Sequence, residues 1–308
     1  MFVVCGEALM DVFAAGDTST GTALDARVGG SPFNVALGLA RLAQPVAFFS
    51  AVSTGFLGDR LMQSLQGEGV DCSTVRRLDA PTTLGLVGLD AKGVPSYSFY
   101  GEGCADRLLG MDALALLPAR IGAVQVGSYA TVVAPTADTL RALVEREHRR
   151  TPICYDPNVR LNVQPALEPW REMLIWMLPR THLLKISDED LNLLRPGVPS
   201  AQFAGEALAA GVRLVVVTRG AEGATAWSRQ GEASVPARAL TVVDTVGAGD
   251  TFQAALLTWL AEHGCLSIEG IPSLSSGQLG DALGFAVSAA AITCSRRGAD
   301  LPRRAELP

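Results

Sequence analysis

The chain has 308 residues, a formal net charge of −6 and 48% hydrophobic residues. It carries no lysine and arginine cluster longer than two residues, which argues against nucleic acid or an anionic membrane surface as a partner. No apolar run approaches the roughly 20 residues that a membrane span requires, and no signal-like segment opens the chain, so we expect a cytoplasmic protein.

Short apolar or β-branched runs alternate with helical periods along the chain. This alternation predicts an α/β fold in which helices cover a mostly parallel sheet. The expected strands are 3–5, 46–49, 124–126, 153–155, 183–186 and 214–217. The expected helices are 34–42, 136–148, 201–210, 252–260 and 282–293. Because no linker of domain-separating length is visible, we expect one domain over residues 1–308.

Two segments interrupt this alternation. Residues from about 12 to 28 and from about 82 to 100 have the pattern of extended chain, with turn signals such as Lys92-Gly93. They predict either a small separate sheet or an antiparallel extension of the main sheet. Their apolar side chains could pair two copies of the chain or pack inward; these are Phe13, Leu84, Leu86 and Val87.

The most informative segment is 244–252, with the sequence DTVGAGDTF, and an apolar helical run follows it. Gly247, Ala248 and Gly249 lack bulk, so their backbone N–H groups can converge on an anion at the start of a helix. A carboxylate at Asp250, next to that anion, is unfavourable unless it has a task. Taking the proton from a hydroxyl that attacks phosphorus is such a task, so the segment predicts a small-molecule kinase.

Three other interpretations of this segment are weaker. A simple helix cap at Asp250 would not require two glycines. A dinucleotide-binding loop needs a third small residue where Phe252 stands, and it belongs after the first strand. A Walker loop is excluded because neither lysine of the chain, Lys92 or Lys185, is followed by Ser or Thr.

Segment 244–252 resembles the C-terminal signature of the PfkB carbohydrate kinases, also called the ribokinase-like family. Segment 28–36, VGGSPFNVA, resembles the N-terminal Gly-Gly motif of that family. Further similarity lies in segments 6–11 (GEALMD), 99–106 (FYGEGCAD), 156–160 (DPNVR) and 217–223 (VTRGAEG). Within the family these segments are most similar to bacterial fructokinases.

The resemblance implies a three-layer α/β/α domain with a small β-sheet lid, formed by residues of about 12–28 and 82–107. It also implies ATP-dependent phosphorylation of a primary hydroxyl of a small sugar, with fructose to fructose 6-phosphate as the first choice. Asp250 would be the general base and Gly247, Ala248 and Gly249 the anion hole. A lid would keep water away from the attacked phosphate, and two chains could form a homodimer through it.

On the sugar side, the resemblance assigns Asp11, Gly29, Gly30 and Asn34 to substrate binding. Short polar side chains on rigid elements suit vicinal hydroxyls, and two glycines would let a sugar approach the backbone. The alternatives are that Asn34 only caps a helix and that Asp11 only solvates a turn.

Two further residues are candidates for contacting the acceptor. Arg160 follows an expected strand and could bind phosphate or a substrate oxygen, or form a surface ion pair. Tyr100 could stack on the sugar from the lid. Many fructokinases carry arginine after the Phe-Tyr pair, where this chain has Gly101, so the acceptor stays open. An acidic acceptor would need a second cation near Arg160, and we see none in the lid segments.

On the nucleotide side, the resemblance assigns Thr218, Gly220 and Gly223 to ATP. Ser187 and Asp190 stand where many members have Asn-x-x-Glu, a motif that orients Mg²⁺ and its waters. Mg²⁺ keeps much of its hydration shell, so a water-mediated contact through Asp190 is expected. From the residues alone, segment 187–190 is a helix start with an acidic first turn.

A monovalent cation, usually K⁺, is implied near Asp244 and Val246, held partly by main-chain carbonyls. The six cysteines form no C-x-x-C pair and the three histidines no H-x-x-x-H pair, so neither a zinc site nor a disulfide framework is predicted.

Other functions remain open at this point. The acceptor could instead be 2-keto-3-deoxygluconate, ribose or a nucleoside. The chain could also be a sugar-binding regulator without catalysis, or an NAD-dependent oxidoreductase. The presence of Asp250 argues against the regulator, and the absence of a complete dinucleotide fingerprint after the first strand argues against the oxidoreductase.

Overall fold

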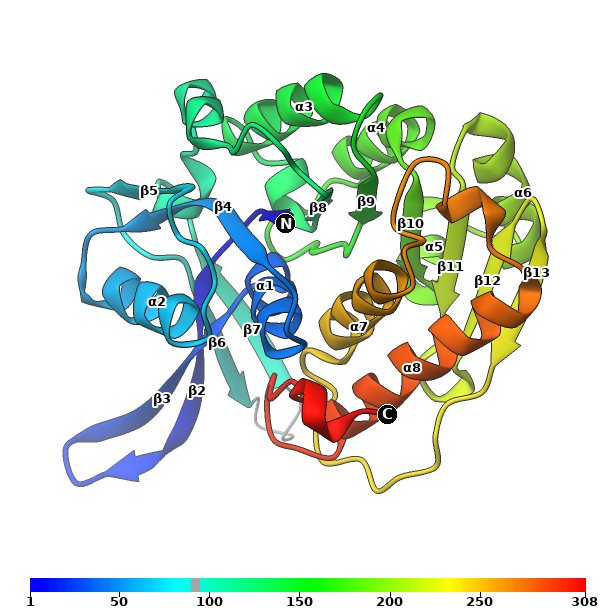
Figure 1. Ribbon diagram of the computed structural model, residues 1–308. Coiled ribbons are helices and arrows are strands. Elements are labelled where there is room, and N and C mark those ends of the chain that lie inside the picture. The colour runs from blue at the N-terminus through cyan, green and yellow to red at the C-terminus, as the bar shows by residue number, and fades with distance from the viewer. Residues whose placement is uncertain (90–94) are drawn as a thin grey trace.

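The computed structural model describes residues 1–89 and 95–308. Its main sheet has nine strands in the order β13-β12-β11-β10-β9-β8-β1-β4-β5 (Figure 1). Neighbours are parallel from β11 to β5, whereas β12 and β13 are added antiparallel. The strands are β1 (Phe2–Cys5), β4 (Val46–Ser53), β5 (Val75–Leu78), β8 (Ala123–Gly127), β9 (Ile153–Asp156), β10 (Leu183–Ser187), β11 (Leu214–Thr218), β12 (Ala224–Ser228) and β13 (Gly231–Val235).

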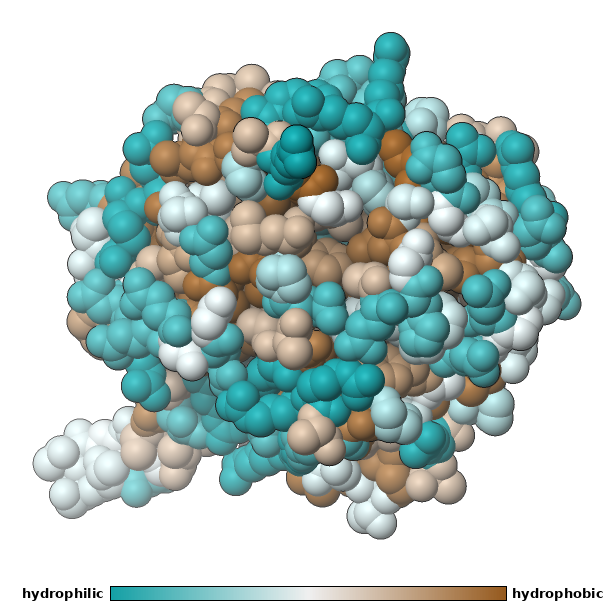
Figure 2. Space-filling view, in the orientation of Figure 1, coloured by the Kyte–Doolittle hydropathy of each residue, from teal (hydrophilic) through white to brown (hydrophobic). Residues whose placement is uncertain are grey.

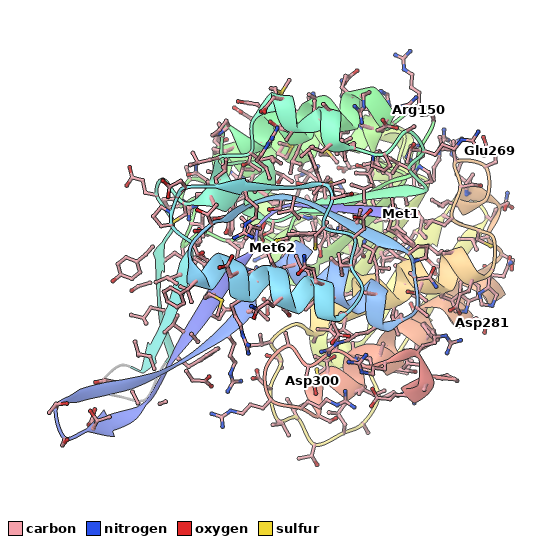
Figure 3. The ribbon with its side chains drawn as sticks, turned by 60° about the vertical axis from the view of Figure 1, so that its left-hand side comes forward. Met1, Met62, Arg150, Glu269, Asp281 and Asp300 are labelled. Atoms are coloured by element: carbon pink, nitrogen blue, oxygen red, sulfur yellow. The ribbon has the colours of Figure 1, made fainter. Side chains whose placement is uncertain are left out.

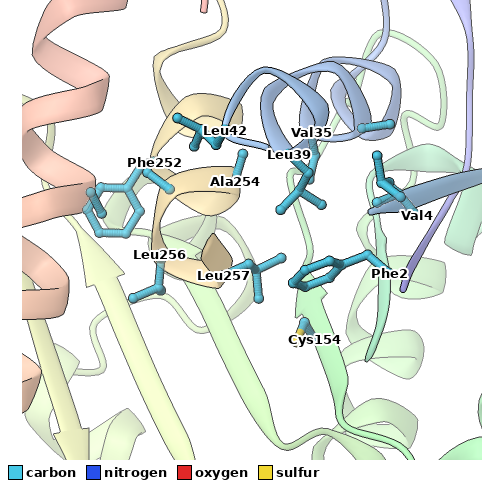
Figure 4. Close-up of a cluster of buried hydrophobic side chains, with 14 of the residues drawn as sticks. Phe2, Val4, Val35, Leu39, Leu42, Cys154, Phe252, Ala254, Leu256 and Leu257 are labelled. Atoms are coloured by element: carbon cyan, nitrogen blue, oxygen red, sulfur yellow. The ribbon is translucent and has the colours of Figure 1, made fainter. Parts of the chain in front are cut away.

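Helices cover both faces of this sheet, which confirms the expected three layers. One face packs on α1 (Ser31–Arg41), α2 (Phe56–Gly67), α7 (Ala248–Glu262) and α8 (Ser276–Cys294). The other packs on α3 (Thr136–Glu147), α4 (Leu167–Met177), α5 (Asp188–Leu194) and α6 (Ser200–Ala210). Side chains of each strand alternate between the two cores. Figure 4 shows the first core, where Leu39 of α1 and Leu257 of α7 meet Phe2 of β1.

All six expected strands are present, and the expected helices are found with shifted ends. Helix α1 begins at Ser31, three residues before the expected start, with Pro32 in its first turn. Helices α2 and α4 were not predicted. Gly58 lowers the helix propensity of the α2 segment. No side chain fits at position 58, because a Cβ there would overlap the carbonyl oxygen of Ser53. Tertiary packing therefore outweighs local propensity in this segment.

The two interrupting segments form a second, four-stranded sheet in the order β3-β2-β6-β7. Its strands are β2 (Leu9–Thr18), β3 (Gly21–Gly29), β6 (Leu84–Leu89) and β7 (Pro95–Tyr100). The β2–β3 hairpin projects from the body in Figure 1, and α2, which carries Met62, lies beside the hairpin base (Figure 3). The prediction of a small separate sheet is therefore confirmed, and the alternative of an antiparallel extension of the main sheet is wrong. The turn expected at Lys92-Gly93 and the side chain of Val87 lie outside the described residues.

Most apolar side chains of the second sheet pack inward. Leu84 and Leu86 pack against the first core, and Phe13 is half-buried. Leu24 of the hairpin is exposed, at 57%. Figure 2 shows mostly intermediate hydropathy on the projecting hairpin, at the lower left. Pairing of two chains through this sheet stays a prediction. Within the described residues, no helix has the length and apolar character that crossing a membrane requires.

Candidate active site

The candidate site lies at the edge of the main sheet where the parallel strands end. Ser187 and Thr218 end β10 and β11 as direct neighbours, and Asp156 ends β9. Because parallel strands bring their carboxyl ends to one edge, residues from distant parts of the chain meet there. Helix α7 begins at the same edge, since a Cβ built on Gly249 would lie 3.3 Å from Nζ of Lys185 in β10.

The start of α7 offers unpaired backbone donors. Gly247 has a φ of 78°, and a Cβ there would lie 2.6 Å from that of Ala299, so both conformation and space require glycine. The Ala248 N–H donates to the Thr245 carbonyl at 3.2 Å. The N–H groups of Gly247, Gly249 and Asp250 donate to no acceptor within the described part of the chain. A helix start with unpaired N–H groups suits an anion, with Ala248 contributing less than expected.

The Asp250 carboxylate is held from two sides by α1. Its Oδ1 accepts a hydrogen bond from Ser31 Oγ at 2.6 Å, and its Oδ2 accepts one from Asn34 Nδ2 at 2.8 Å. One turn further along each helix, a Cβ on Gly38 would lie 2.7 Å from that of Ala254. This close approach of α1 and α7 brings the three polar side chains together. Ser31 was not predicted from the sequence, and Asn34 donates to the Asp250 carboxylate, while its contact with a sugar stays a prediction.

Burial raises the pKa of Asp250 above its ordinary value. The hydrogen bonds from Ser31 and Asn34 oppose that rise, as do the charges of Lys185 and Arg160. A half-buried carboxylate with a raised pKa is a better proton acceptor than a solvated one.

Lys185 is a site residue that the sequence analysis missed. Its side chain is only 5% exposed, and its Nζ donates to Asp156 Oδ2 at 2.8 Å. Burial alone would lower the pKa of Lys185, but the charge and hydrogen bond of Asp156 raise it above its usual value, so the ammonium stays charged. A positive charge therefore lies beneath the start of α7. A signal was available, because a lysine inside an apolar buried strand needs a partner or a task.

Arg160 lies amid the carboxyls of the site. Its Nη1 donates to the Val159 carbonyl at 3.0 Å, and it forms no ion pair within residues 1–89 and 95–308. Burial raises the pKa of four carboxyls around it, and the charge of Arg160 opposes the rise in each; they are Glu7, Asp11, Asp190 and Asp250. The alternative of a surface ion pair is therefore wrong.

Asp11 belongs to β2 of the second sheet, and burial raises its pKa to about 6. A Cβ on Gly29 would overlap Asp11 Oδ2, and one on Gly85 would lie 2.9 Å from Oδ1. Gly30 has a φ of 109°, and a Cβ there would lie 2.8 Å from the Glu7 carbonyl oxygen. Both glycines of the Gly-Gly motif thus make room for atoms of the protein itself, a reason not foreseen from the sequence.

The structure does not bring Tyr100 to the site. Phe99 pairs with Gly85, which pairs with Asp11, so these three residues share one face of the second sheet. Tyr100 is the next residue along β7, so it points to the opposite face, where it is 61% exposed. Stacking of Tyr100 on a sugar is therefore a wrong expectation, and Phe99 is the aromatic residue on the face that bears Asp11.

Ser187 and Asp190 have structural tasks at the start of α5. Ser187 Oγ accepts a hydrogen bond from the Asp190 N–H at 3.0 Å and so caps the helix. Asp190 Oδ1 accepts one from the Val159 N–H at 3.2 Å, and burial raises the Asp190 pKa to about 6. The prediction that segment 187–190 starts a helix is thus confirmed. Asp190 lies at the sheet edge, where the charge of Asp156 adds to the rise in its pKa.

The three candidates on β11 and after it differ from one another. Thr218 is half-buried at the strand end, and Gly220 is exposed with a φ of 46°. Gly223 is buried with a φ of 91°, and a Cβ there would overlap the Val235 carbonyl oxygen. Gly223 is therefore glycine because the backbone after β13 packs on it, whereas Thr218 and Gly220 remain accessible at the edge.

Asp244 ties two loops together. Its Oδ1 accepts a hydrogen bond from the Val246 N–H at 3.0 Å, and its Oδ2 accepts one from the Gly298 N–H at 2.8 Å. A cation there would thus depend on main-chain carbonyls. In the described part of the chain, no group of three His, Cys, Asp or Glu side chains could hold a metal. Asp156 Oδ1 is buried without a partner and Asp190 is nearby, which suits a hydrated, oxygen-preferring ion such as Mg²⁺.

Comparison with known proteins gives a consistent result. The sequence model of the pfkB family of carbohydrate kinases matches residues 1–305. A fructokinase of Rhizobium leguminosarum bv. trifolii is 33% identical over 279 residues, which cover 91% of this chain and 85% of the relative. Fructokinase-1 of Oryza sativa subsp. japonica is 31% identical, with 91% and 86% covered. A crystal structure of fructokinase with bound ATP from Xylella fastidiosa superposes with a TM-score of 0.86 at 26% identity, covering 100% of this chain and 94% of that one.

Proposed function

Because the chain belongs to the pfkB family of carbohydrate kinases, and is therefore a phosphotransferase with an alcohol acceptor, we propose that it phosphorylates fructose from ATP, giving fructose 6-phosphate. The choice of fructose rests on the names of the relatives described above, and the choice of ATP on the nucleotide bound in the Xylella fastidiosa structure.

One observation carries the proposal. The Asp250 carboxylate, fixed by Ser31 and Asn34, stands beside the unpaired N–H groups at the start of α7. There Asp250 accepts the proton of the sugar hydroxyl as its oxygen attacks phosphorus in line. The N–H groups of Gly249 and Asp250 and the ammonium of Lys185 stabilise the negative charge on the transferring group.

The remaining residues bind the two substrates. Asp11 accepts hydrogen bonds from sugar hydroxyls, and Arg160 donates to a sugar or phosphate oxygen. Asn34 positions Asp250, and Ser187, Thr218 and Gly220 border the nucleotide. Mg²⁺, when bound with ATP, neutralises phosphate charge, and Asp190 with Asp156 would hold its waters. Carbonyls around Asp244 and Val246 would hold a K⁺ ion.

The second sheet is proposed as a lid that belongs to the same single domain as the main sheet. Asp11 lies in β2 of the second sheet and Asp250 in helix α7, which packs on the main sheet, and the charge of Asp250 raises the pKa of Asp11. A sugar between these carboxylates would be covered by the lid, which keeps water from accepting the phosphate. An enzyme that consumes ATP works where ATP is available, so we place it in the cytoplasm.

A direct test measures ADP formation with a panel of acceptors: fructose, glucose, ribose, 2-keto-3-deoxygluconate and a nucleoside. We expect the highest kcat/KM with fructose, and ³¹P NMR should identify the product as a 6-phosphate. EDTA should abolish the activity, and K⁺ should stimulate it more than Na⁺ does. A higher kcat/KM with another acceptor would overturn the choice of fructose. Sugar binding by calorimetry without any ADP formation would favour a non-catalytic regulator.

A further inference from the structure

The guanidinium of Arg107, beside the lid, occupies the space that a side chain at position 101 would otherwise fill. Arg107 ends the short 3₁₀ helix η1 (Ala105–Arg107), which follows β7 closely. A Cβ built on Gly101 would overlap Nη2 and Cζ of Arg107 and lie 2.7 Å from its Nε. The backbone of Gly101 is not in the left-handed region, so conformation does not demand glycine there. Space does, because the guanidinium lies where a side chain at position 101 would begin.

Within the described part of the chain, this guanidinium forms no hydrogen bond and no ion pair. Its Nε is buried and has no hydrogen-bond partner. Within residues 1–89 and 95–308 no carboxylate lies within ion-pair distance, and the guanidinium lies over the Tyr129 ring, whose centroid is 5.3 Å from Cζ. Unmade hydrogen bonds of a buried charged donor are costly, so buried donors nearly always have an acceptor. The acceptor expected here comes from a ligand.

The backbone that carries Arg107 is nevertheless held firmly. Asp106, the preceding residue, accepts hydrogen bonds from Thr83 Oγ1 at 2.5 Å and from the Tyr129 hydroxyl at 2.7 Å. The Ala105 N–H donates to the Pro81 carbonyl at 2.9 Å. An arginine on a fixed segment with free donors is preorganised for binding, since little conformational freedom is lost when a ligand arrives.

The guanidinium also lies on the sugar side of the lid. Asp11, Gly85 and Phe99 are paired neighbours and share one face of the second sheet. Gly101 follows Phe99 by two residues and stands directly after the end of β7, and continuation of the strand alternation by one residue places position 101 on the face of Phe99. Arg107 fills the space at position 101, so it stands on the face that bears Asp11. The expectation that the lid segments hold no cation is therefore wrong.

We propose that Arg107 binds the acceptor: its guanidinium donates hydrogen bonds to hydroxyl oxygens of a neutral sugar at the lid end of the pocket, and Gly101 leaves it room. This inference rests on the proposed sugar kinase function. A neutral sugar is favoured over an acid because the Asp11 and Asp250 carboxyls are close enough for the charge of Asp250 to raise the pKa of Asp11, and two such carboxylates would repel an acceptor carboxylate between them. Hydroxyls, in contrast, can donate to the carboxylates and accept from the guanidinium.

The test compares two variants that disturb the guanidinium differently. Arg107→Ala removes it, and Gly101→Ala displaces it by overlap. In both, we expect the KM for fructose to rise at least about tenfold, a factor that corresponds to about 1.4 kcal/mol, while the KM for ATP stays unchanged. Arg107→Lys should recover part of the loss, because it keeps the charge without the planar fork. Gly88→Ala, in the same sheet, is the matched control, since no described atom lies within 4 Å of a Cβ built there.

The outcomes separate the two hypotheses. An unchanged KM for fructose in both folded variants would overturn the role of Arg107, and so would a loss of melting temperature and kcat without a change in KM. An effect confined to 2-keto-3-deoxygluconate would overturn the neutral sugar. If the unaltered enzyme phosphorylates no sugar of the panel, the proposed function itself fails, and the role of Arg107 fails with it.

Discussion

The phosphate side and the lid side of the site are built in different ways. On the phosphate side, the Lys185–Asp156 pair is embedded in the main core, with side chains that are 5% and 4% exposed, and it lies beneath the backbone N–H groups at the start of α7. On the lid side, Asp11 and Phe99 stand on the second sheet and Arg107 on η1, and Tyr100, on the other face of that sheet, is 61% exposed. The chemistry of transfer thus depends on a rigid framework. The choice of acceptor depends on side chains of a smaller element.

This contrast also explains what each side can tolerate. The phosphate side uses positions where glycine is required, such as Gly247, so a side chain there disturbs the backbone itself. On the lid side, a change from Gly101 to a larger residue displaces another side chain and leaves the sheet intact. We therefore expect that related kinases with the same phosphoryl-transfer chemistry but different acceptors differ mainly in the second sheet and in η1.

The largest effect is expected on the phosphate side, from Asp250→Asn. The amide cannot accept the hydroxyl proton, so kcat should fall at least about a hundredfold, while the KM values for sugar and ATP change little. Steady-state kinetics measure this. Asp281→Asn, at a surface carboxylate of α8 that Figure 3 labels, is the control and should behave like the unaltered enzyme. An unchanged kcat in Asp250→Asn would rule out its role as base.

Lys185→Met tests whether the buried ammonium beneath α7 contributes to phosphate transfer or only to the stability of the core. Breaking a buried ion pair leaves Asp156 uncompensated and should cost about 3–5 kcal/mol of stability. The double variant Asp156→Asn/Lys185→Met removes both charges and should recover much of the melting temperature. Its kcat should nevertheless stay at least about tenfold low, since a charge-assisted contact to phosphate is lost. Full activity in the stable double variant would make Lys185 purely structural.

Ser31→Ala addresses the link between the two helices, and a smaller loss of kcat/KM is expected. The Ser31 hydrogen bond lowers the pKa of Asp250, so its removal should raise that pKa further. The base must be ionised to act, hence the acid limb of the kcat/KM profile should move to higher pH. Ser31→Thr keeps the hydroxyl and should restore the limb. If the limb does not move in Ser31→Ala, the hydrogen bond does not tune the base.

The smallest effect is on stability, through the buried carboxyls near the lid. Burial raises the pKa of Glu7 from 4.5 to about 7 and that of Asp11 from 3.8 to about 6. Between the ordinary and the raised pKa of each group, the folded protein binds more protons than the unfolded chain. The free energy of unfolding therefore falls as the pH rises through this range. The melting temperature without ligands should be higher at about pH 5 than at about pH 8.

Glu7→Gln should flatten this dependence and stabilise the protein at the higher pH, because the buried Glu7 carboxyl then no longer has to ionise. Glu269→Gln, at an exposed position labelled in Figure 3, should leave the dependence unchanged. Differential scanning calorimetry at both pH values measures each variant. An equal pH dependence in Glu7→Gln would show that another group is responsible.

Sequence patterns predict the main sheet well, because its buried parallel strands are short apolar runs that need little context. Helix α2 escapes prediction, since Gly58 is chosen by contact with Ser53 and not by helix propensity. Asp250 and the glycines before it are predictable for the same reason as the strands: one contiguous segment contains both the helix start and the carboxylate. Ser31 is not, because its contact with Asp250 joins segments far apart in the chain. Lys185 is marked by its place in an apolar strand, but its pairing with Asp156 is not predictable from local sequence.

The sequence by itself determined the α/β class, the glycine-rich helix start with its carboxylate and the kinase chemistry, because each depends on residues adjacent in the chain. Only the tertiary structure decided that Phe99 and not Tyr100 faces the sugar side, that Lys185 lies beneath α7, and that Arg107 fills the space over Gly101. The physical reason is that strand register and packing set these relations: a shift of one residue turns a side chain to the other face, and no local pattern specifies which atoms will meet across the fold.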